Sequence, residues 1–184
     1  MSNQLTIKSD EINVYATLRV RSKFIGKLVL SILVFGLIVF YVFLALNVNN
    51  ENAQILVFFL LVFGFIIFFP IKYLLWNLYG NEILIVNTKS ISYSYYYGLF
   101  KTNLKTINHE RLGLSFEFVK LEDKIEKGKL NFYNYNNSNN LPVLIHQTTV
   151  LINKKEIELL ELAIQKLFKS EIDENNIYSG FSLN

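Results

Sequence analysis

Few side chains in this chain of 184 residues could act as nucleophiles, bases or metal ligands. It has two histidines, His109 and His146, and no cysteine, which excludes disulfides, thiol catalysis and zinc–thiolate sites within it. No second histidine follows His109 at the spacing of a zinc-binding helix. We expect His109 to lie in a turn, as a solvated or backbone-bonded imidazole. An enzyme would need a polar pocket that joins one of these histidines to carboxylates.

Three carboxylates, Glu122, Asp123 and Glu126, are of the type that divalent cations prefer. Lysines interleave with them, which favours a solvated, charged turn over residues 122–129 instead of a metal site. The GxG and GK[ST] patterns of phosphate-binding loops do not occur. We therefore assign no catalytic, cofactor-binding or metal-binding residue, and expect no cofactor and no enzymatic activity.

Two segments have a biased composition. The tyrosines at positions 93, 95, 96 and 97 form an aromatic recognition surface or pack within a sheet, and packing is the more common use of such residues. Residues 131–140 contain six asparagines and are typical of a flexible loop.

Two uncharged apolar runs, residues 28–46 and 55–71, lie on either side of a polar octapeptide. At about 1.5 Å per residue, the first run covers about 28 Å, close to the thickness of a hydrocarbon core. Backbone groups in lipid must be satisfied internally, so both runs should be helical, and the short connection allows only an antiparallel return. We predict a transmembrane hairpin over residues 24–79, with helices at about 24–47 and 54–78.

The charges around this hairpin predict its orientation. The loop carries only Glu51, whereas basic residues flank the other helix ends: Arg19, Arg21, Lys23, Lys27 and Lys72. By the positive-inside rule, both termini should be cytoplasmic. Gly36 and Gly64 are the only glycines in the two runs, and they mark either the crossing point of the helices or two unrelated tolerated positions. Pro70 should kink or loosen the second helix.

In the rest of the chain, apolar and polar residues alternate, which is typical of β-strands. Residues 80–170 should form six or seven antiparallel strands, at about 82–86, 90–97, 101–107, 112–118, 130–135 and 143–152. Leu112, Leu114, Phe116 and Phe118 should share one buried face. An amphipathic helix should close the sheet, with Asn153 and Glu156 at its start and one apolar face: Ile157, Leu160, Ala163, Ile164, Leu167 and Phe168. Residues 171–184 should be a flexible tail.

Residues 1–23, which precede the membrane, also contain an alternating segment: Ile12, Val14, Ala16, Leu18 and Val20. This pattern is typical of a strand. A single strand is not stable in water, so we predict that it pairs with the downstream sheet. The alternative is an extended arm next to the membrane.

Short strands followed by one C-terminal helix are the element order of a pleckstrin-homology (PH)-like roll. Residues 76–80, Glu82 and residues 97–100 resemble bacterial membrane proteins in which two helices precede a PH-like domain, and residues 150–155 are similar to the YcxB-like relatives of that group. The resemblance spans residues 24–169. It implies an α+β fold, in which a two-helix transmembrane hairpin precedes an antiparallel PH-like β roll closed by a C-terminal α-helix, and a cytoplasmic interaction module.

The expected partners follow from charge. Residues 80–184 contain twelve basic and twelve acidic residues, so no nucleic-acid-binding face is evident. The turn at residues 87–89 has a single lysine, unlike the basic hairpin of phosphoinositide-binding PH domains, so we do not expect phosphoinositide binding. Lys101 and Lys105 either contact anionic headgroups or are solvated strand lysines.

We therefore expect an integral protein of the inner membrane whose PH-like module binds a protein partner or a second copy. The alternatives are an accessory subunit of a transporter or channel, and a membrane-bound enzyme.

Overall fold

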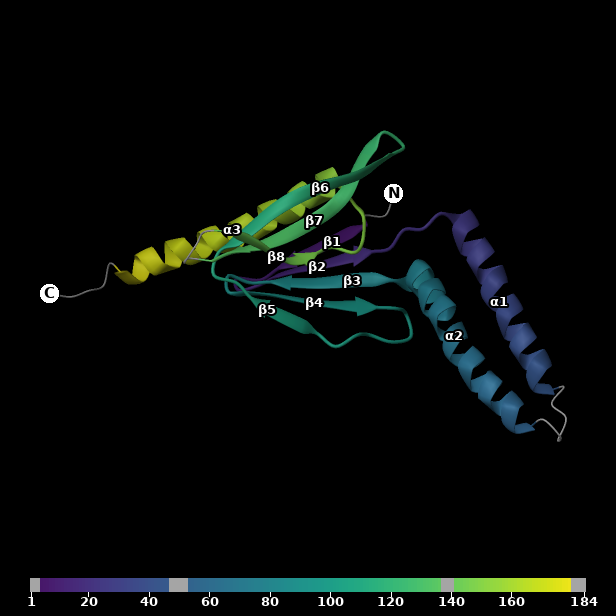
Figure 1. The fold of residues 1–184 in the computed structure, drawn as a ribbon. Helices are drawn as coiled ribbons and strands as arrows, with labels where there is room; N and C mark the ends of the chain where they lie inside the picture. The colour runs from purple at the N-terminus through teal and green to yellow at the C-terminus, as the bar shows by residue number, and fades with distance from the viewer. Residues whose placement is uncertain (1–3, 47–52, 137–140, 180–184) are drawn as a thin grey trace. The chain divides into compact units, whose positions relative to one another are not determined.

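The computed structural model describes residues 4–46, 53–136 and 141–179 (Figure 1). The protein is α+β, with two apolar helices, two antiparallel sheets and a C-terminal helix, as the sequence predicts. It divides into two compact units. Residues 21–80 and 97–100 form the helical unit, and residues 1–20, 81–96 and 101–184 form the β-domain.

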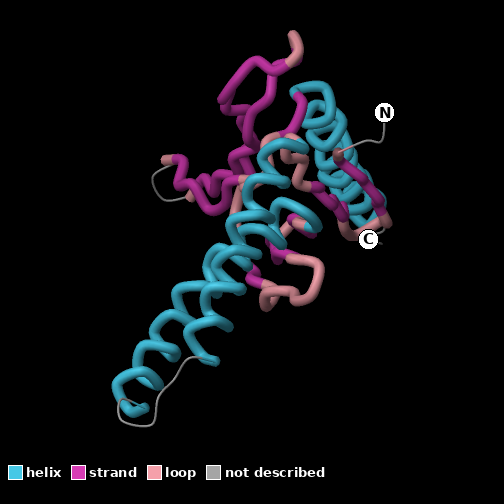
Figure 2. Tube along the Cα trace, turned by 90° about the vertical axis from the view of Figure 1, so that its right-hand side faces the viewer, coloured by secondary structure: helices cyan, strands magenta, loops and turns pink. Residues whose placement is uncertain are grey.

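The helical unit contains α1 (Phe24–Leu46) and α2 (Ala53–Tyr79), close to the predicted ranges. The two helices lie side by side (Figure 2). Both are long and apolar enough to cross a membrane, and large apolar side chains such as Phe35, Phe43 and Phe65 are exposed on their surfaces. The helix α2 continues through Pro70.

Gly36 and Gly64 do not form the crossing point of the helices, so that prediction is wrong. A β-carbon added to Gly64 would lie 3.7 Å from the hydroxyl of Tyr41, whereas one added to Gly36 would meet nothing within 4 Å. Large side chains make the contact instead, including the rings of Phe40 and Phe63, whose centroids are 6.4 Å apart. Glycines need not mark a helix crossing when bulky residues fill the interface.

The first sheet of the β-domain contains β1 (Leu5–Ser9), β2 (Val14–Arg19), β3 (Asn81–Val86), β4 (Ser90–Tyr96) and β5 (Lys105–Asn108), in that order. The strand β2 pairs antiparallel with β3. The prediction that the N-terminal strand joins the downstream sheet is therefore confirmed, and the helical unit is inserted into the connection between two paired strands.

Two details of this sheet differ from the predictions. The strand β1 was not expected, because its alternating pattern is short and ends in the polar residues Lys8 and Ser9. Asp10 builds the turn that folds β1 onto β2, since its Oδ1 accepts hydrogen bonds from the N–H groups of Ile12 and Asn13. The strand predicted at 101–107 is also shorter, because β5 begins only at Lys105.

The second sheet contains β6 (Leu112–Glu122), β7 (Ile125–Tyr135), β8 (Pro142–Gln147) and β9 (Ile152–Asn153). Its order is β6-β7-β8, and β9 also pairs with β7. The charged turn predicted at 122–129 is present but much shorter, because Asp123 and Lys124 alone reverse the chain, with φ of 53° and 63°, and residues 125–129 belong to β7. The loop predicted at 131–140 is partly wrong, since residues 131–135 belong to β7, and residues 137–140 lie outside the described residues.

The helix α3 (Lys154–Ser179) closes the β-domain as predicted. Asn153 caps it, since its Oδ1 accepts a hydrogen bond from the N–H of Lys155 at 3.1 Å. The helix packs against strands of both sheets, including β1, β2, β6 and β7 (Figure 1). Its buried face is Ile157, Leu160, Ile164 and Leu167. The helix extends to Ser179 where we expected a tail from residue 171, because adding residues to an existing helix costs little.

Candidate binding cleft between β6 and α3

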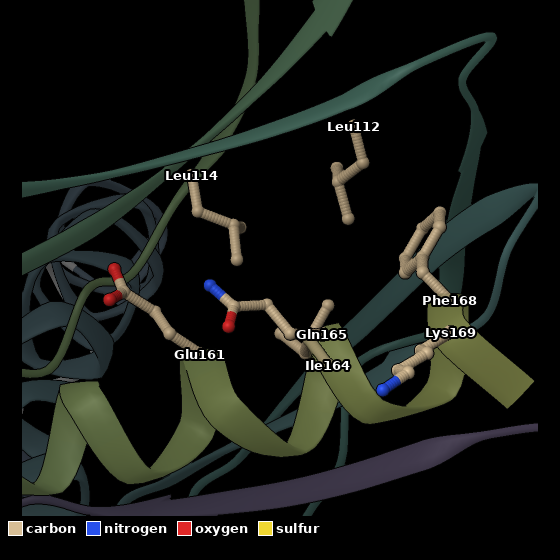
Figure 3. A pocket seen from close by; sticks show the side chains of 7 residues that line it. All are labelled: Leu112, Leu114, Glu161, Ile164, Gln165, Phe168 and Lys169. Atoms are coloured by element: carbon tan, nitrogen blue, oxygen red, sulfur yellow. The ribbon is translucent and has the colours of Figure 1, made fainter.

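A cleft of about 450 Å³ separates β6 from α3 (Figure 3). In Figure 3, Leu112 and Leu114 project from β6 toward the helix, and the side chain of Gln165 reaches into the space between them. Seven residues line the cleft: Leu112, Leu114, Glu161, Ile164, Gln165, Phe168 and Lys169.

The periodicity of each element explains this lining. Leu112 and Leu114 are two residues apart on a strand and therefore share one face. On α3, Glu161, Ile164 and Phe168 follow the three- and four-residue spacing of one helix face. The cleft consequently has an apolar floor, and polar groups lie along α3 at its rim.

The predicted burial of the β6 face is only partly correct. Leu112, Leu114 and Phe116 are half-buried, but Phe118 is 56% exposed. The helix α3 begins at Lys154, directly after β9, and β9 pairs with Lys127 and Gly128 of β7. Phe118 lies opposite Gly128, so β6 continues beyond the start of the helix from this point. The exposed end of β6 is therefore at Phe118, whereas the cleft lies at the other end of the strand, at Leu112 and Leu114.

The backbone of β6 has a free edge beside this cleft. Among the described residues, β7 is the only strand that pairs with β6. Arg111 bonds to β7, because its C=O accepts a hydrogen bond from the N–H of Tyr135. Phe116 lies opposite Leu130 of β7. The N–H and C=O of Leu130 both bond to Thr148, on the side of β7 away from β6. Bonded pairs alternate along an antiparallel ladder, so the backbone groups of Leu112, Leu114 and Phe116 point away from β7.

The polar groups of the cleft support binding more than catalysis. Burial, and then the nearby charge of Glu158, raise the pKa of Glu161 above its usual 4.5. Gln165 and Lys169 complete the polar rim, and the lining residues include neither a histidine nor a hydroxyl group. A carboxyl group without a nucleophile or a second base beside it can orient a ligand but does not form a catalytic set.

The structure does join a histidine to a carboxylate, but away from the cleft. Nε2 of His146 lies 2.9 Å from Oε1 of Glu82, and Oε2 of Glu82 accepts hydrogen bonds from the N–H groups of Thr149 and Val150. The ring of Tyr93 stacks on that of His146 at 4.0 Å. His146 and Glu82 are both buried, and neither lines the cleft. This buried pair connects the two sheets.

His109 is backbone-bonded, one of the two predicted alternatives. Its Nε2 lies 3.3 Å from the C=O of Asn87, and its ring is buried, 6.3 Å from that of Phe168. Within the described part of the chain, its Nδ1 has no hydrogen-bond partner. Burial lowers the pKa of His109, and the bond to Asn87 opposes part of that shift. The ring is therefore favoured in its neutral form.

The acidic residues at the tip of the β6–β7 hairpin pair with lysines. Glu122 contacts Lys127 at 2.9 Å and Lys120 at 3.3 Å, and Glu126 contacts Lys154 at 3.0 Å. The described residues contain no group of three His, Cys, Asp or Glu side chains placed to hold a metal ion.

Two tyrosines of β4, Tyr93 and Tyr95, pack, which is the favoured alternative, whereas Tyr96 is exposed. Besides its contact with His146, Tyr93 packs edge-on against Tyr95, and the hydroxyl of Tyr95 accepts a hydrogen bond from Thr149.

Sequence reasoning placed Leu112, Leu114, Ile164 and Phe168 in the core and did not single out Glu161, Gln165 or Lys169. A polar residue at position 82, on the alternating face of Leu84 and Val86, was the signal that could have revealed the buried carboxylate. No family model, curated protein or solved structure matches the chain.

Proposed function

We propose that the protein is a membrane-anchored interaction module that binds a segment of a partner protein. The helices α1 and α2 anchor it in the inner membrane of a bacterium, and its PH-like β-domain, tethered at Arg19 and Asn81, holds the partner in the β6–α3 cleft. The observation that carries this proposal is the cleft itself, an apolar floor with a polar rim beside a free strand edge.

The proposed orientation places both termini, and hence the β-domain, in the cytoplasm. The basic residues before α1 and at Lys72, with Glu51 as the single charge of the connecting loop, support this orientation. Because the chain has no cysteine, a single cysteine introduced as Asn50→Cys should react in intact cells with a thiol reagent that does not cross membranes. Labelling that requires lysis would contradict the proposal.

Binding in the cleft is tested by crosslinking in cells. A photoreactive amino acid in place of Gln165, which lines the cleft, should capture a partner protein that mass spectrometry identifies. The same group in place of Lys155, an exposed position near the start of α3 that does not line the cleft, is the control.

The captured partner is then purified, and its affinity is measured for the full-length protein in lipid nanodiscs. Leu112→Glu places a charge on the cleft floor and should weaken binding at least tenfold, whereas Lys155→Glu should have little effect. Equal capture from both positions, or equal affinity of the two variants, would contradict binding in the cleft. If the captured protein is a second copy of this chain, the cleft mediates self-association and does not bind a different partner.

A further inference from the structure

We infer that the cleft takes its partner as an added β-strand: an extended segment pairs with the free edge of β6 at residues 112–116 and places alternate apolar side chains in the cleft. This inference rests on the proposed function and specifies the ligand of the same site.

The first reason is the direction of the β6 backbone groups. The N–H and C=O groups of Leu112, Leu114 and Phe116 point away from β7, and in the described residues no strand or side chain bonds to them. A row of unpaired backbone groups at a sheet edge is the surface to which an extended segment adds. A ligand that pairs with these backbone groups must be an extended polypeptide, because a lipid chain has no N–H and C=O groups at this spacing.

The second reason is that the free edge and the cleft involve the same residues. Leu112 and Leu114 direct their side chains toward α3 while their backbone groups point outward (Figure 3). A strand added at the usual spacing of about 4.8 Å continues the same sheet face. Every second side chain of the added strand therefore faces Ile164 and Phe168, and the intervening side chains face the other way.

The charge of Glu161 specifies one end of the segment. Glu161 and Lys169 lie two helical turns apart on α3. In Figure 3, the carboxylate of Glu161 points toward Leu114, whereas Lys169, next to Phe168, directs its ammonium away from Leu112 and the cleft. All pairs in this sheet are antiparallel, and an antiparallel segment would run from the Glu161 end to the Lys169 end. Its cleft-facing residues should thus be basic first, opposite Glu161, and then apolar at two alternate positions.

The probe is a displayed library of random nonapeptides, selected against the full-length protein in nanodiscs and counter-selected against the Leu112→Glu variant. The enriched peptides should show alternate apolar residues. The best of them, resynthesised, should slow amide hydrogen exchange at Leu112, Leu114 and Phe116. N-methylation of its backbone at the residues that bond to β6 should weaken binding about tenfold, and N-methylation of the residues between them should have a smaller effect.

A proline variant tests the same edge from the protein side. Leu114→Pro removes an N–H that β7 does not use, and proline is tolerated where a strand N–H faces outward. Leu114→Ala removes the cleft side chain but keeps that N–H and is the matched control. We expect Leu114→Pro to bind the selected peptide at least tenfold more weakly than Leu114→Ala. If Leu114→Pro does not fold, the N-methylated peptides on the unmodified chain decide the question.

The outcomes separate the two levels of the proposal. If a peptide depends on Leu112 but its N-methylated forms all bind equally and the β6 amides exchange unchanged, strand addition is wrong and the binding cleft stands. If no peptide is enriched over the Leu112→Glu variant, strand addition is also wrong, and crosslinking from Gln165 alone decides the proposed function.

Discussion

Glu82 on β3 and His146 on β8 are 64 positions apart in the sequence, and their side chains meet at 2.9 Å between the two sheets. The carboxylate of Glu82 accepts this hydrogen bond and two more from the backbone of Thr149 and Val150. Within the described residues, its hydrogen bonds all go to the segment that contains β8 and the residues after it. Glu82 therefore connects the first sheet to the second, and with it to the segment that leads into α3.

Removing this carboxylate should destabilise the β-domain. Glu82→Ala leaves the ring N–H of His146 and two backbone N–H groups without an acceptor in a buried site, so the free energy of unfolding should fall by about 3 kcal/mol or more. Thermal or urea unfolding of the full-length protein in micelles measures the change. Glu117→Ala is the control, because Glu117 also accepts side-chain hydrogen bonds, from Asn131 and Gln147, but is exposed. Equal losses in the two variants would contradict this role of Glu82.

The buried ring of His109 should make the fold sensitive to mild acid. Burial lowers the pKa of His109 below 6.5 in the folded state, so the unfolded chain binds this proton more readily. Its contribution to stability is therefore complete above pH 6.5 and is lost as the pH falls below that value. His109→Gln cannot take up this proton, and its melting temperature should fall less than that of the unmodified chain between pH 7.5 and 5.5. Parallel pH profiles of the two proteins would show that His109 does not contribute.

Glu161 should have the opposite dependence on pH. Its pKa is raised above 4.5 by burial and by the charge of Glu158, so folding disfavours the ionised form. The resulting stability is present below pH 4.5 and is lost as the pH rises through the folded pKa. Glu161→Gln carries no charge and should melt higher than the unmodified protein at pH 7, with the difference vanishing near pH 4. Glu158→Gln should reproduce part of the gain, and a gain that does not change with pH would contradict this interpretation.

The elements that could be predicted from the sequence are those whose pattern is local. Val14, Ala16 and Leu18 alternate with polar residues, and they are buried in β2 as expected. Ile157, Leu160 and Ile164 follow helical spacing and form the buried face of α3. The turn at Asp123 and Lys124 was predicted as part of a longer turn over residues 122–129, because neither residue is the glycine or asparagine that usually marks a two-residue turn with positive φ. The charges of Glu126, Lys127 and Lys129 then resembled a loop, although these residues belong to β7.

The cleft could not be predicted because it depends on the order of the strands in the sheet. Leu112 and Leu114 have the same alternating pattern whether β6 is a central or an edge strand. Their partial exposure arises because β6 pairs only with β7 among the described strands, and because of where α3 crosses the sheet. The partner of Glu82 was hidden for the same reason, since contacts between distant strands leave no local spacing to detect.

The ion pairs of Glu122 with Lys127 and Lys120, at the tip of the β6–β7 hairpin, can be tested through the pKa of Glu122. The ammonium of Lys127, and next that of Lys120, lower the pKa of Glu122 to about 2. The carboxylate carbon of Glu122 should therefore titrate near pH 2 by nuclear magnetic resonance of the labelled full-length protein in micelles. Lys127→Gln should move this midpoint toward 4.5 by more than Lys120→Gln does, because Lys127 is the closer partner. Glu122 and Lys127 are half-buried, and a pKa that is lowered on folding contributes stability above pH 4.5. Lys127→Gln should therefore also lower the melting temperature at pH 7, and this loss should shrink as the pH falls toward 2. A midpoint near 4.5 in the unmodified protein would mean that the lysines are not held against Glu122 in solution, and the hairpin would then have two acidic groups, Glu122 and Asp123, accessible at its tip.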